Sequence, residues 1–389
     1  MLRKRISLIA LAIISCCHAP LARRAADDSA NIRGIVDAAI RPVMAEYDVP
    51  GMAVALTVDG RPMFFNYGVA SRENNSPVSE ETLFEIGSDS KTFTATLASY
   101  AQALGKLSLD DRPGKYMPQL EGSAIDNVSL LNLGTFTAGD LPLQFPDEVS
   151  DNGRMIDYFR QWKPVATPGA QRRYSNPSIG LLGHITGLAM KSDFADAVET
   201  QLFPKLGLHH SYVRVPQSAM ANYAWGYSSA NKPIRVNPGT LDAEAYGIKS
   251  TAADMIRFVQ ANIEPSRLEG AMQRAIEGTH VGFFNVGEMV QGLGWEQYPY
   301  PVTLERLQAG NSSKMALESN AATRLTPPHA PSGPTLFNKT GSTNGFGAYI
   351  AFVPEKKIGI VMLANRNFPI PARVKAAHAI LDQLASIAK

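Results

Sequence analysis

A serine and a lysine three residues apart, Ser88 and Lys91, are the strongest candidates for chemistry in this 389-residue sequence. They lie where Gly87 interrupts one segment and a helix is predicted to begin, with Ser88, Asp89 and Ser90 as candidate capping residues. Residues three apart on a helix share one face. A serine hydroxyl is a weak nucleophile until a neighbour accepts its proton, and a lysine with a lowered pKa can do so. The pair therefore predicts nucleophilic catalysis.

Two later motifs add specificity to this pair. Alone it is common, because Ser-x-x-Lys recurs at Ser229 and at Ser386, and most such pairs lie on solvated surfaces. The tripeptide Tyr-Ser-Asn occupies residues 174–176, and Lys-Thr-Gly occupies residues 339–341. Each tripeptide alone is an ordinary turn or strand end, but the three motifs in this order are harder to attribute to chance.

Tyr174 is the candidate general base. A free phenol has a pKa near ~10. If Lys91 and Lys339 flank the ring, their charges favour the phenolate, which could then accept a proton at neutral pH. Lys339 closes a strand predicted over residues 335–339, and Gly341 leaves that strand edge open to the backbone of a ligand.

The N-terminus predicts secretion. Basic residues 3–5 precede an apolar run over residues 6–14 that is too short to span a bilayer. We therefore expect a signal peptide over residues 1–25, with its cleavage point left open, and a periplasmic mature protein. Residues 13–16 loosely resemble a lipoprotein box, which makes a lipidated form the minor alternative. Both cysteines lie in this segment, so the mature chain would lack disulfides and cysteine ligands.

Charge and histidine spacing restrict the partners. Loss of the five basic residues before residue 25 would leave 32 Lys and Arg against 35 Asp and Glu. This balance favours neither nucleic acid nor an anionic membrane as a partner. The seven histidines show no spacing typical of metal ligands. We expect a monomer with no cofactor, no metal, no stable membrane association and a small-molecule substrate.

Strand patterns occur near both ends of the chain and helical patterns between them. A hairpin is predicted from residues 52–58 and 63–67 around Asp59-Gly60. Later strands are predicted at 335–339, 346–353 and 358–363, with a shorter one around 292–295, and helices begin after 27–29 and at Pro371. We therefore predict an α/β (α+β) fold with a mostly antiparallel sheet flanked by helices. Its α/β domain comprises residues 26–85 and 250–389, and a mainly helical domain, residues 86–249, is inserted.

Together, the three motifs resemble the signature elements of the serine β-lactamase and penicillin-binding-protein superfamily, and the tyrosine at 174 is the class C version. Longer segments also resemble class C cephalosporinases, namely residues 141–147, 171–180, 241–247, 291–296 and 341–354. The resemblance covers essentially the whole mature chain. A literal Ser-Asp-Asn at 150–152 matches the class A element, but the Glu-x-x-x-Asn of that class does not follow, so we interpret it as a polar loop.

The resemblance implies a β-lactamase/transpeptidase-like fold and hydrolysis of β-lactams, preferentially cephalosporins, through an acyl-enzyme on Ser88. Lys91 and Tyr174 would relay the proton beside Lys339, and the N–H groups of Ser88 and Ser342 would bind the oxyanion. The resemblance also implies substrate contacts. Gln144 and Asn176 would bind the acylamino side chain, Asn176 would also bridge to Lys91, and Tyr246 would line the side-chain pocket. The substrate carboxylate would be bound by Lys339, Thr340, Asn367 and Arg373.

Two residues depart from the family pattern. Asp89 follows the nucleophile where the family usually has a small or apolar residue, and a buried unpaired carboxylate there would be costly or protonated. Asp140 stands where the family usually has glycine, so a positive φ would strain it. Two alternatives to hydrolysis of β-lactams stay open. A D-Ala-D-Ala carboxypeptidase or serine esterase on the same scaffold can share all three motifs, and Asp89 alone suggests an inactive penicillin-binding protein.

Overall fold

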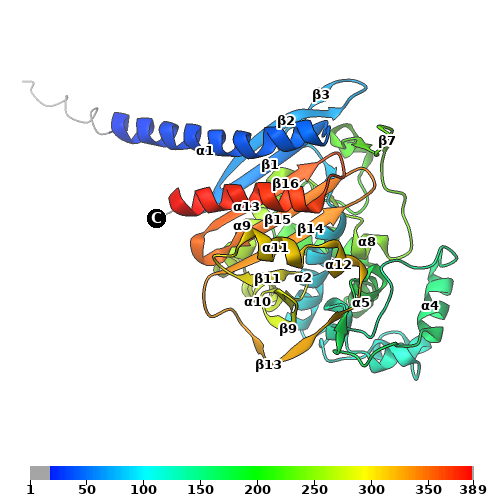
Figure 1. Ribbon diagram of the computed structural model, residues 1–389. Coiled ribbons are helices and arrows are strands. Elements are labelled where there is room, and N and C mark those ends of the chain that lie inside the picture. Colours follow the sequence, from blue (N-terminus) through cyan, green and yellow to red (C-terminus); the bar gives the residue numbers. More distant parts are fainter. Residues whose placement is uncertain (1–17, 388–389) are drawn as a thin grey trace, which may run out of the picture.

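The computed structural model describes residues 18–387 and is built on one ten-stranded sheet. The strand order is β13-β9-β10-β11-β14-β15-β16-β1-β2-β3, and every pair of neighbouring strands is antiparallel. Figure 1 shows α1 and α13 side by side on one face of this sheet, whereas α4, α5 and α8 gather at the right of the view, where α5 and α8 pack against α2. The predicted mixed fold with an antiparallel sheet is confirmed. The domain boundaries stay a prediction.

The strands of the sheet come from both ends of the chain. They are β1 Gly51–Val58, β2 Arg61–Ser71, β3 Ser76–Pro77, β9 Gly282–Val286, β10 Met289–Gly292, β11 Glu296–Pro299, β13 Thr323–His329, β14 Thr335–Ser342, β15 Gly347–Val353 and β16 Ile358–Ala364. Two-residue strands form three small ladders, with β4 Phe84–Glu85 beside β8 Lys249–Ser250, β5 Gln171–Arg172 beside β12 Asn320–Ala321, and β6 Gly226–Tyr227 beside β7 Pro233–Ile234.

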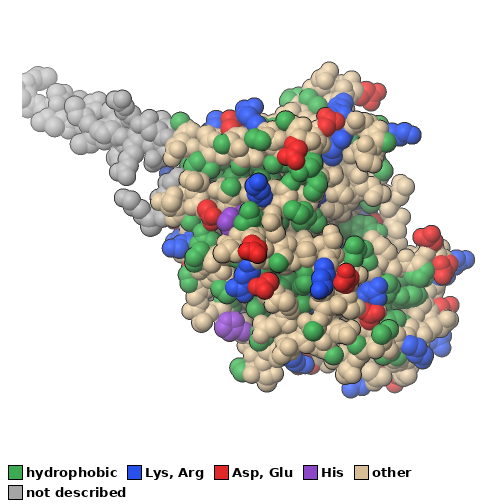
Figure 2. All heavy atoms as spheres, viewed as in Figure 1, with side chains coloured by type: hydrophobic (Ala, Val, Ile, Leu, Met, Phe, Trp, Pro, Cys, Tyr) green, Lys and Arg blue, Asp and Glu red, His purple; other side chains and the backbone are tan. Residues whose placement is uncertain are grey.

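The helices cover the sheet and fill the middle of the chain. The α-helices are α1 His18–Glu46, α2 Ser90–Ala103, α3 Leu130–Gly134, α4 Asn152–Gln161, α5 Asn176–Ala189, α6 Phe194–Ala197, α7 Phe203–Lys205, α8 Asp242–Ala245, α9 Ala252–Ile263, α10 Gly270–Thr279, α11 Leu304–Gly310, α12 Ser313–Leu317 and α13 Ile370–Ile387. Among residues 18–387, no helix combines the length and apolar character that a bilayer span requires. Acidic and basic side chains are interspersed over the face shown in Figure 2.

Both faces of the central strands are buried, which fixes their register. In β1, Met52, Val54 and Leu56 pack with α1 and α13, whereas Ala53 and Ala55 belong to the core that contains α2 and α9. This alternation is the period-two pattern of a strand with apolar layers on both sides. The predicted β1–β2 hairpin is confirmed, and Asp59 and Gly60 both have the positive φ of its tight turn.

Three sequence-based boundaries were wrong. Helix α1 begins at His18 rather than after residues 27–29, and residues 1–17 of the expected signal peptide lie outside the described part of the chain. Strand β14 continues to Ser342, so the Lys-Thr-Gly motif lies within a strand that pairs with β15. The strand expected around 292–295 is mostly the turn between β10 and β11, and Gly294 supplies the positive φ there.

The nucleophile segment is locked against β14 by two glycines. Gly87 has φ 53°, and a Cβ atom there would collide with the backbone of Ser342. A Cβ atom at Gly341 would collide with the carbonyl oxygen of Ile86. Because glycine has no side chain at either position, the turn that carries Ser88 can lie directly on the strand that carries Lys339.

We expect Gly87→Ala to destabilise the protein more than Gly105→Ala. Both positions have positive φ, 53° and 68°, but nothing lies within 4 Å of a Cβ at Gly105. Gly105→Ala is the control, and it should cost only the free energy of holding a non-glycine residue at positive φ, about 1 kcal/mol. Overpacking against Ser342 should add about 1–3 kcal/mol at Gly87. Urea unfolding of both variants measures the difference, and equal losses would contradict the proposed close contact.

Candidate active site

Ser88 and Lys91 meet as the sequence predicts. Ser88 lies in a 3₁₀ turn, Gly87–Asp89, that leads directly into α2, and Lys91 lies in the first turn of that helix. Lys91 Nζ donates to Ser88 Oγ at 2.9 Å and to the carbonyl oxygen of Ala245 at 2.7 Å. Ser88 is partly exposed, whereas Lys91 is fully buried. A nucleophile open to a ligand therefore contacts a lysine held away from water.

Two details of this segment differ from expectation. No side-chain cap is present, because the 3₁₀ turn precedes α2 and Ser90 Oγ instead accepts from the backbone N–H of Ile248. The expected bridge from Asn176 to Lys91 is also not formed within the described residues, since the second acceptor of Lys91 is Ala245 at the end of α8. Both differences arise from the α8 region, which packs against α2.

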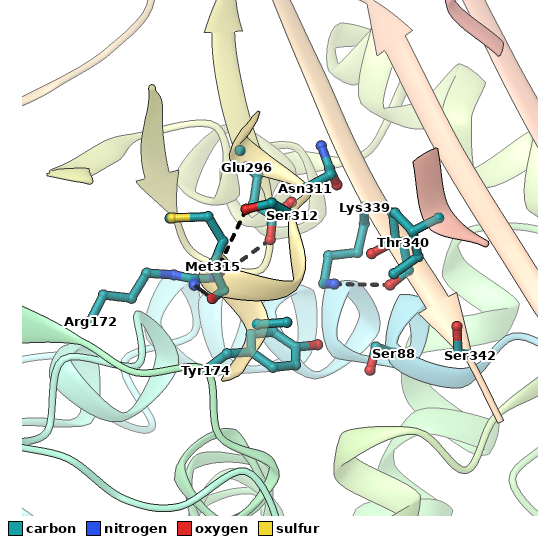
Figure 3. Close-up of a pocket in the computed structure, with 13 residues that line it drawn as sticks. Ser88, Arg172, Tyr174, Glu296, Asn311, Ser312, Met315, Lys339, Thr340 and Ser342 are labelled. Carbon is teal, nitrogen blue, oxygen red and sulfur yellow. Dashed lines mark hydrogen bonds and ion pairs between the residues drawn. The ribbon is translucent and has the colours of Figure 1, made fainter. Parts of the chain in front are cut away.

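Tyr174 lies between the two lysines. Lys91 Nζ and Lys339 Nζ are each 5.0 Å from the centroid of its ring. Its hydroxyl is buried and makes no hydrogen bond within residues 18–387. Figure 3 shows this hydroxyl directed toward Ser88 and the Lys339 amine. Ser175 fixes the approach of the chain, because its Oγ caps α5 by accepting from the N–H of Ser178 at 3.1 Å.

The electrostatics of these three groups favour proton transfer. Burial would raise the pKa of Tyr174, but the charges of Lys339 and Lys91 outweigh burial and lower the pKa. Burial lowers the pKa of Lys91 to about 8. Burial also acts to lower the pKa of Lys339, yet the negative charge on Tyr174 and Glu296 raises it overall. Lys339 is thus held as a cation, whereas the pKa values of Lys91 and Tyr174 are both lowered, which favours exchange of a proton between them.

The expected substrate contacts line two cavities that share Ser88, Tyr174 and Ser342. The smaller, about 120 Å³, also includes Lys339 and Thr340. The larger, about 460 Å³, also includes Gln144, Asn176, Tyr246 and Asn367. The motifs from three distant parts of the sequence therefore line two adjoining cavities around the nucleophile.

Arg373 lines neither cavity. It is 1% exposed, and its Nη1 donates to the carbonyl oxygen of Gly341 at 2.7 Å and to Ser342 Oγ at 3.0 Å. Its Nη2 donates to Asn367 Oδ1 at 2.5 Å. This geometry gives Arg373 a supporting position beneath Ser342 and Asn367, and direct contact with a substrate carboxylate stays a prediction.

A buried ion pair beside Tyr174 was not anticipated. Arg172 Nη2 lies 3.4 Å from Glu296 Oε1, and its Nε donates to Gln291 Oε1 at 2.7 Å. The Arg172 guanidinium carbon lies 5.4 Å from the centroid of the Tyr174 ring and 5.4 Å from that of the Phe136 ring. These two rings pack against each other. The only signal in the sequence was a charged residue two positions before the tyrosine, and its partners lie more than a hundred residues away.

Asp89 is buried without a partner. It is 0% exposed, and neither carboxyl oxygen makes a hydrogen bond within the described residues. Burial raises the pKa of this carboxyl to about 8, against the lowering effect of the charges on Lys339 and Arg373. Asp89 is therefore mostly protonated at neutral pH, so it adds little negative charge beside Lys91.

Asp140 adopts the strained backbone that the sequence suggested, with φ 86°. Its carboxylate forms an ion pair with Arg173 Nη1 at 2.7 Å and accepts from Ser319 Oγ. These contacts offset part of the strain of a non-glycine residue at positive φ. The residue is thus accommodated outside the two cavities.

No group of three potential metal ligands occurs within residues 18–387. The chemistry of this site is that of a serine, two amines and a phenol on an antiparallel sheet with helices on both sides. This combination defines a serine acyl-transfer site.

Comparisons with known proteins identify the family. The sequence model of the Beta-lactamase family matches residues 36–385. A β-lactamase of Pseudomonas fluorescens is 53% identical over 354 residues, 91% of this chain and 99% of the relative. A crystal structure of a class C β-lactamase in complex with cefoxitin is 50% identical, with a TM-score of 0.89 and coverage of 92% of this chain and 99% of the other. A β-lactamase/D-alanine carboxypeptidase from Pseudomonas syringae is 48% identical, with the same TM-score and coverage of 90% and 99%. The chain therefore belongs to the β-lactamase family, and its structural relatives are class C serine enzymes.

Asp89 predicts an unusual pH dependence of stability. Its pKa is about 8 in the folded protein, and an unfolded aspartate has ~3.9. The folded state therefore retains a proton that the unfolded state releases, so this residue makes the protein less stable as pH rises from about 4 to about 8. Between pH 5 and 7.5 the wild type should lose about 3 kcal/mol more than Asp89→Asn, as measured by urea unfolding. Asp110→Asn, at an exposed site, is the control, and parallel curves for wild type and Asp89→Asn would contradict the assignment.

Proposed function

We propose that this protein hydrolyses β-lactam antibiotics, cephalosporins preferentially, through an acyl-enzyme on Ser88. The observation that carries the proposal is the contact of Ser88 Oγ with Lys91 Nζ at 2.9 Å beside the Tyr174 ring, which Lys91 and Lys339 flank. These groups supply a partly exposed nucleophile, a proton acceptor and a fixed positive charge in one site.

In acylation, Ser88 Oγ attacks the lactam carbonyl carbon and forms the C–O bond. Lys91 and Tyr174 take the hydroxyl proton and pass it to the lactam nitrogen as the C–N bond breaks. The N–H groups of Ser88 and Ser342 stabilise the oxyanion of the tetrahedral intermediate. The close approach of Gly87 to Ser342 supports this pairing of donors.

In deacylation, water attacks the ester carbonyl and the bond to Ser88 Oγ breaks. Tyr174 accepts the proton of the water, and the serine regains its own proton from the Lys91–Tyr174 pair. Lys339 and Thr340 hold the substrate carboxylate, together with Asn367 and the underlying Arg373. Gln144 and Asn176 bind the acylamino group, and Tyr246 forms a wall of the side-chain cavity.

A D-Ala-D-Ala carboxypeptidase is the second candidate. One structural relative carries both names, β-lactamase and D-alanine carboxypeptidase, and both reactions share the acylation of a serine. We further propose that the protein acts as a monomer in the periplasm after removal of its N-terminal segment. The basic and apolar pattern of residues 3–14 supports this location.

Hydrolysis of a chromogenic cephalosporin by the purified protein tests the proposal, with benzylpenicillin and a p-nitrophenyl ester in parallel. We expect the cephalosporin to have the highest kcat/KM and Ser88→Ala to lower kcat by about 10⁴-fold or more. Ser229→Ala, in the exposed Ser-x-x-Lys motif, is the control and should change nothing. Turnover of only the ester would indicate an esterase instead, and turnover of only a D-Ala-D-Ala peptide would indicate a carboxypeptidase. Stoichiometric acylation without turnover would indicate an inactive penicillin-binding protein.

A further inference from the structure

One side chain that lines the larger cavity beside the nucleophile carries a permanent charge. Among the described residues that line it, Arg235 is the only lysine, arginine, aspartate, glutamate or histidine. Ser88, Gln144 and Asn176 line the same cavity, so the side chain of an acyl group on Ser88 would share this space with the Arg235 guanidinium. Apart from Tyr174, whose phenol can ionise, the other lining residues are apolar or uncharged.

Arg235 is held rigidly by two aromatic rings. Its guanidinium carbon lies 3.9 Å from the centroid of the Tyr223 ring and 4.1 Å from that of Trp225. Nε donates to the carbonyl oxygen of Ala224 at 3.1 Å, and Nη2 donates to that of Tyr223. Nη1 donates no hydrogen bond within residues 18–387. A preorganised cation of this kind loses little conformational entropy when an anion binds it.

The charge of Glu85 acts on Arg235, but the two groups form no ion pair among the described residues. Glu85 Oε1 accepts from the Tyr223 hydroxyl and from the N–H of Val236, both at 2.7 Å, and Oε2 accepts from Thr343 Oγ1 at 2.5 Å. Glu85 is 2% exposed and lies outside the cavity lining. Within the described residues it forms no ion pair with Arg235. Glu85 thus fixes the Tyr223 ring on which the guanidinium stacks, and Arg235 lines the cavity without a salt-bridge partner among the described residues.

We propose that Arg235 determines specificity, favouring β-lactams whose acylamino side chain bears a carboxylate over those whose side chain bears an amine. This inference rests on the proposed function of the site, and it adds a preference for the charge of the side chain. Attraction of an anion and repulsion of a cation by the same guanidinium both contribute to the preference. Because Arg235 is only partly buried, these interactions are stronger than on an open surface yet still respond to salt.

Benzylpenicillin derivatives with an α-carboxyl or an α-amino group test the proposal, because they differ only in the charge of one small substituent. The readout is the ratio of kcat/KM for the α-carboxy compound to that for the α-amino compound. We expect Arg235→Gln to lower this ratio about tenfold, and Arg235→Lys to retain most of it because the charge remains. Lys232→Gln, an exposed change of the same charge three residues away, should leave the ratio unchanged.

Ionic strength gives a second measurement that needs no variant. In the wild type, the ratio should fall as salt is raised from about 0.01 to about 0.5 M, because screening weakens both interactions. An unchanged ratio in Arg235→Gln, or a ratio in the wild type that is insensitive to salt, would overturn the role of Arg235. Failure of the wild type to hydrolyse these penicillins and the chromogenic cephalosporin alike would overturn the proposed function as well, so the two failures are distinguishable.

Discussion

Two buried ammonium groups, each 5.0 Å from the centroid of one phenol ring, form the interaction on which the site depends. Each charged group alone would be costly to bury, yet Tyr174 between Lys91 and Lys339 lets the three share charge. Lys91 yields to burial and its pKa falls to about 8, whereas the pKa of Lys339 rises beside the tyrosine and Glu296. A proton can therefore move from Ser88 into the site without leaving an uncompensated charge.

The fold provides this arrangement by bringing three distant segments together at very short range. The turn carrying Ser88 contacts β14 through Gly87 and Gly341, where side chains would collide with the facing backbone. The start of α5 places Tyr174 above this contact, and α8 supplies the carbonyl oxygen that holds Lys91. The large sheet, buried on both faces, keeps β14 rigid beneath the reacting groups.

The sequence allowed prediction of the antiparallel α/β fold and of the motifs that meet at the candidate site, because reactive residue types, glycines and alternating apolar residues are local signals. Strands β9, β11 and β13 were missed, since they are short or polar and are defined by their neighbours. The Arg172–Glu296 pair and the stacking of Arg235 depend on contacts between distant segments, for which one sequence holds no signal. The sequence identified Asp89 as anomalous, but only the structure showed that it is buried and unpaired.

The pKa of Tyr174 in the free enzyme tests the central claim most directly. Tyrosine labelled with ¹³C at Cζ reports its ionisation by NMR, and Tyr174→Phe assigns the resonance. We predict a pKa below the ~10 of a free phenol, and a higher pKa in Lys339→Ala, which removes one of the flanking charges. A wild-type pKa at or above ~10 that does not respond to loss of Lys339 would contradict the account.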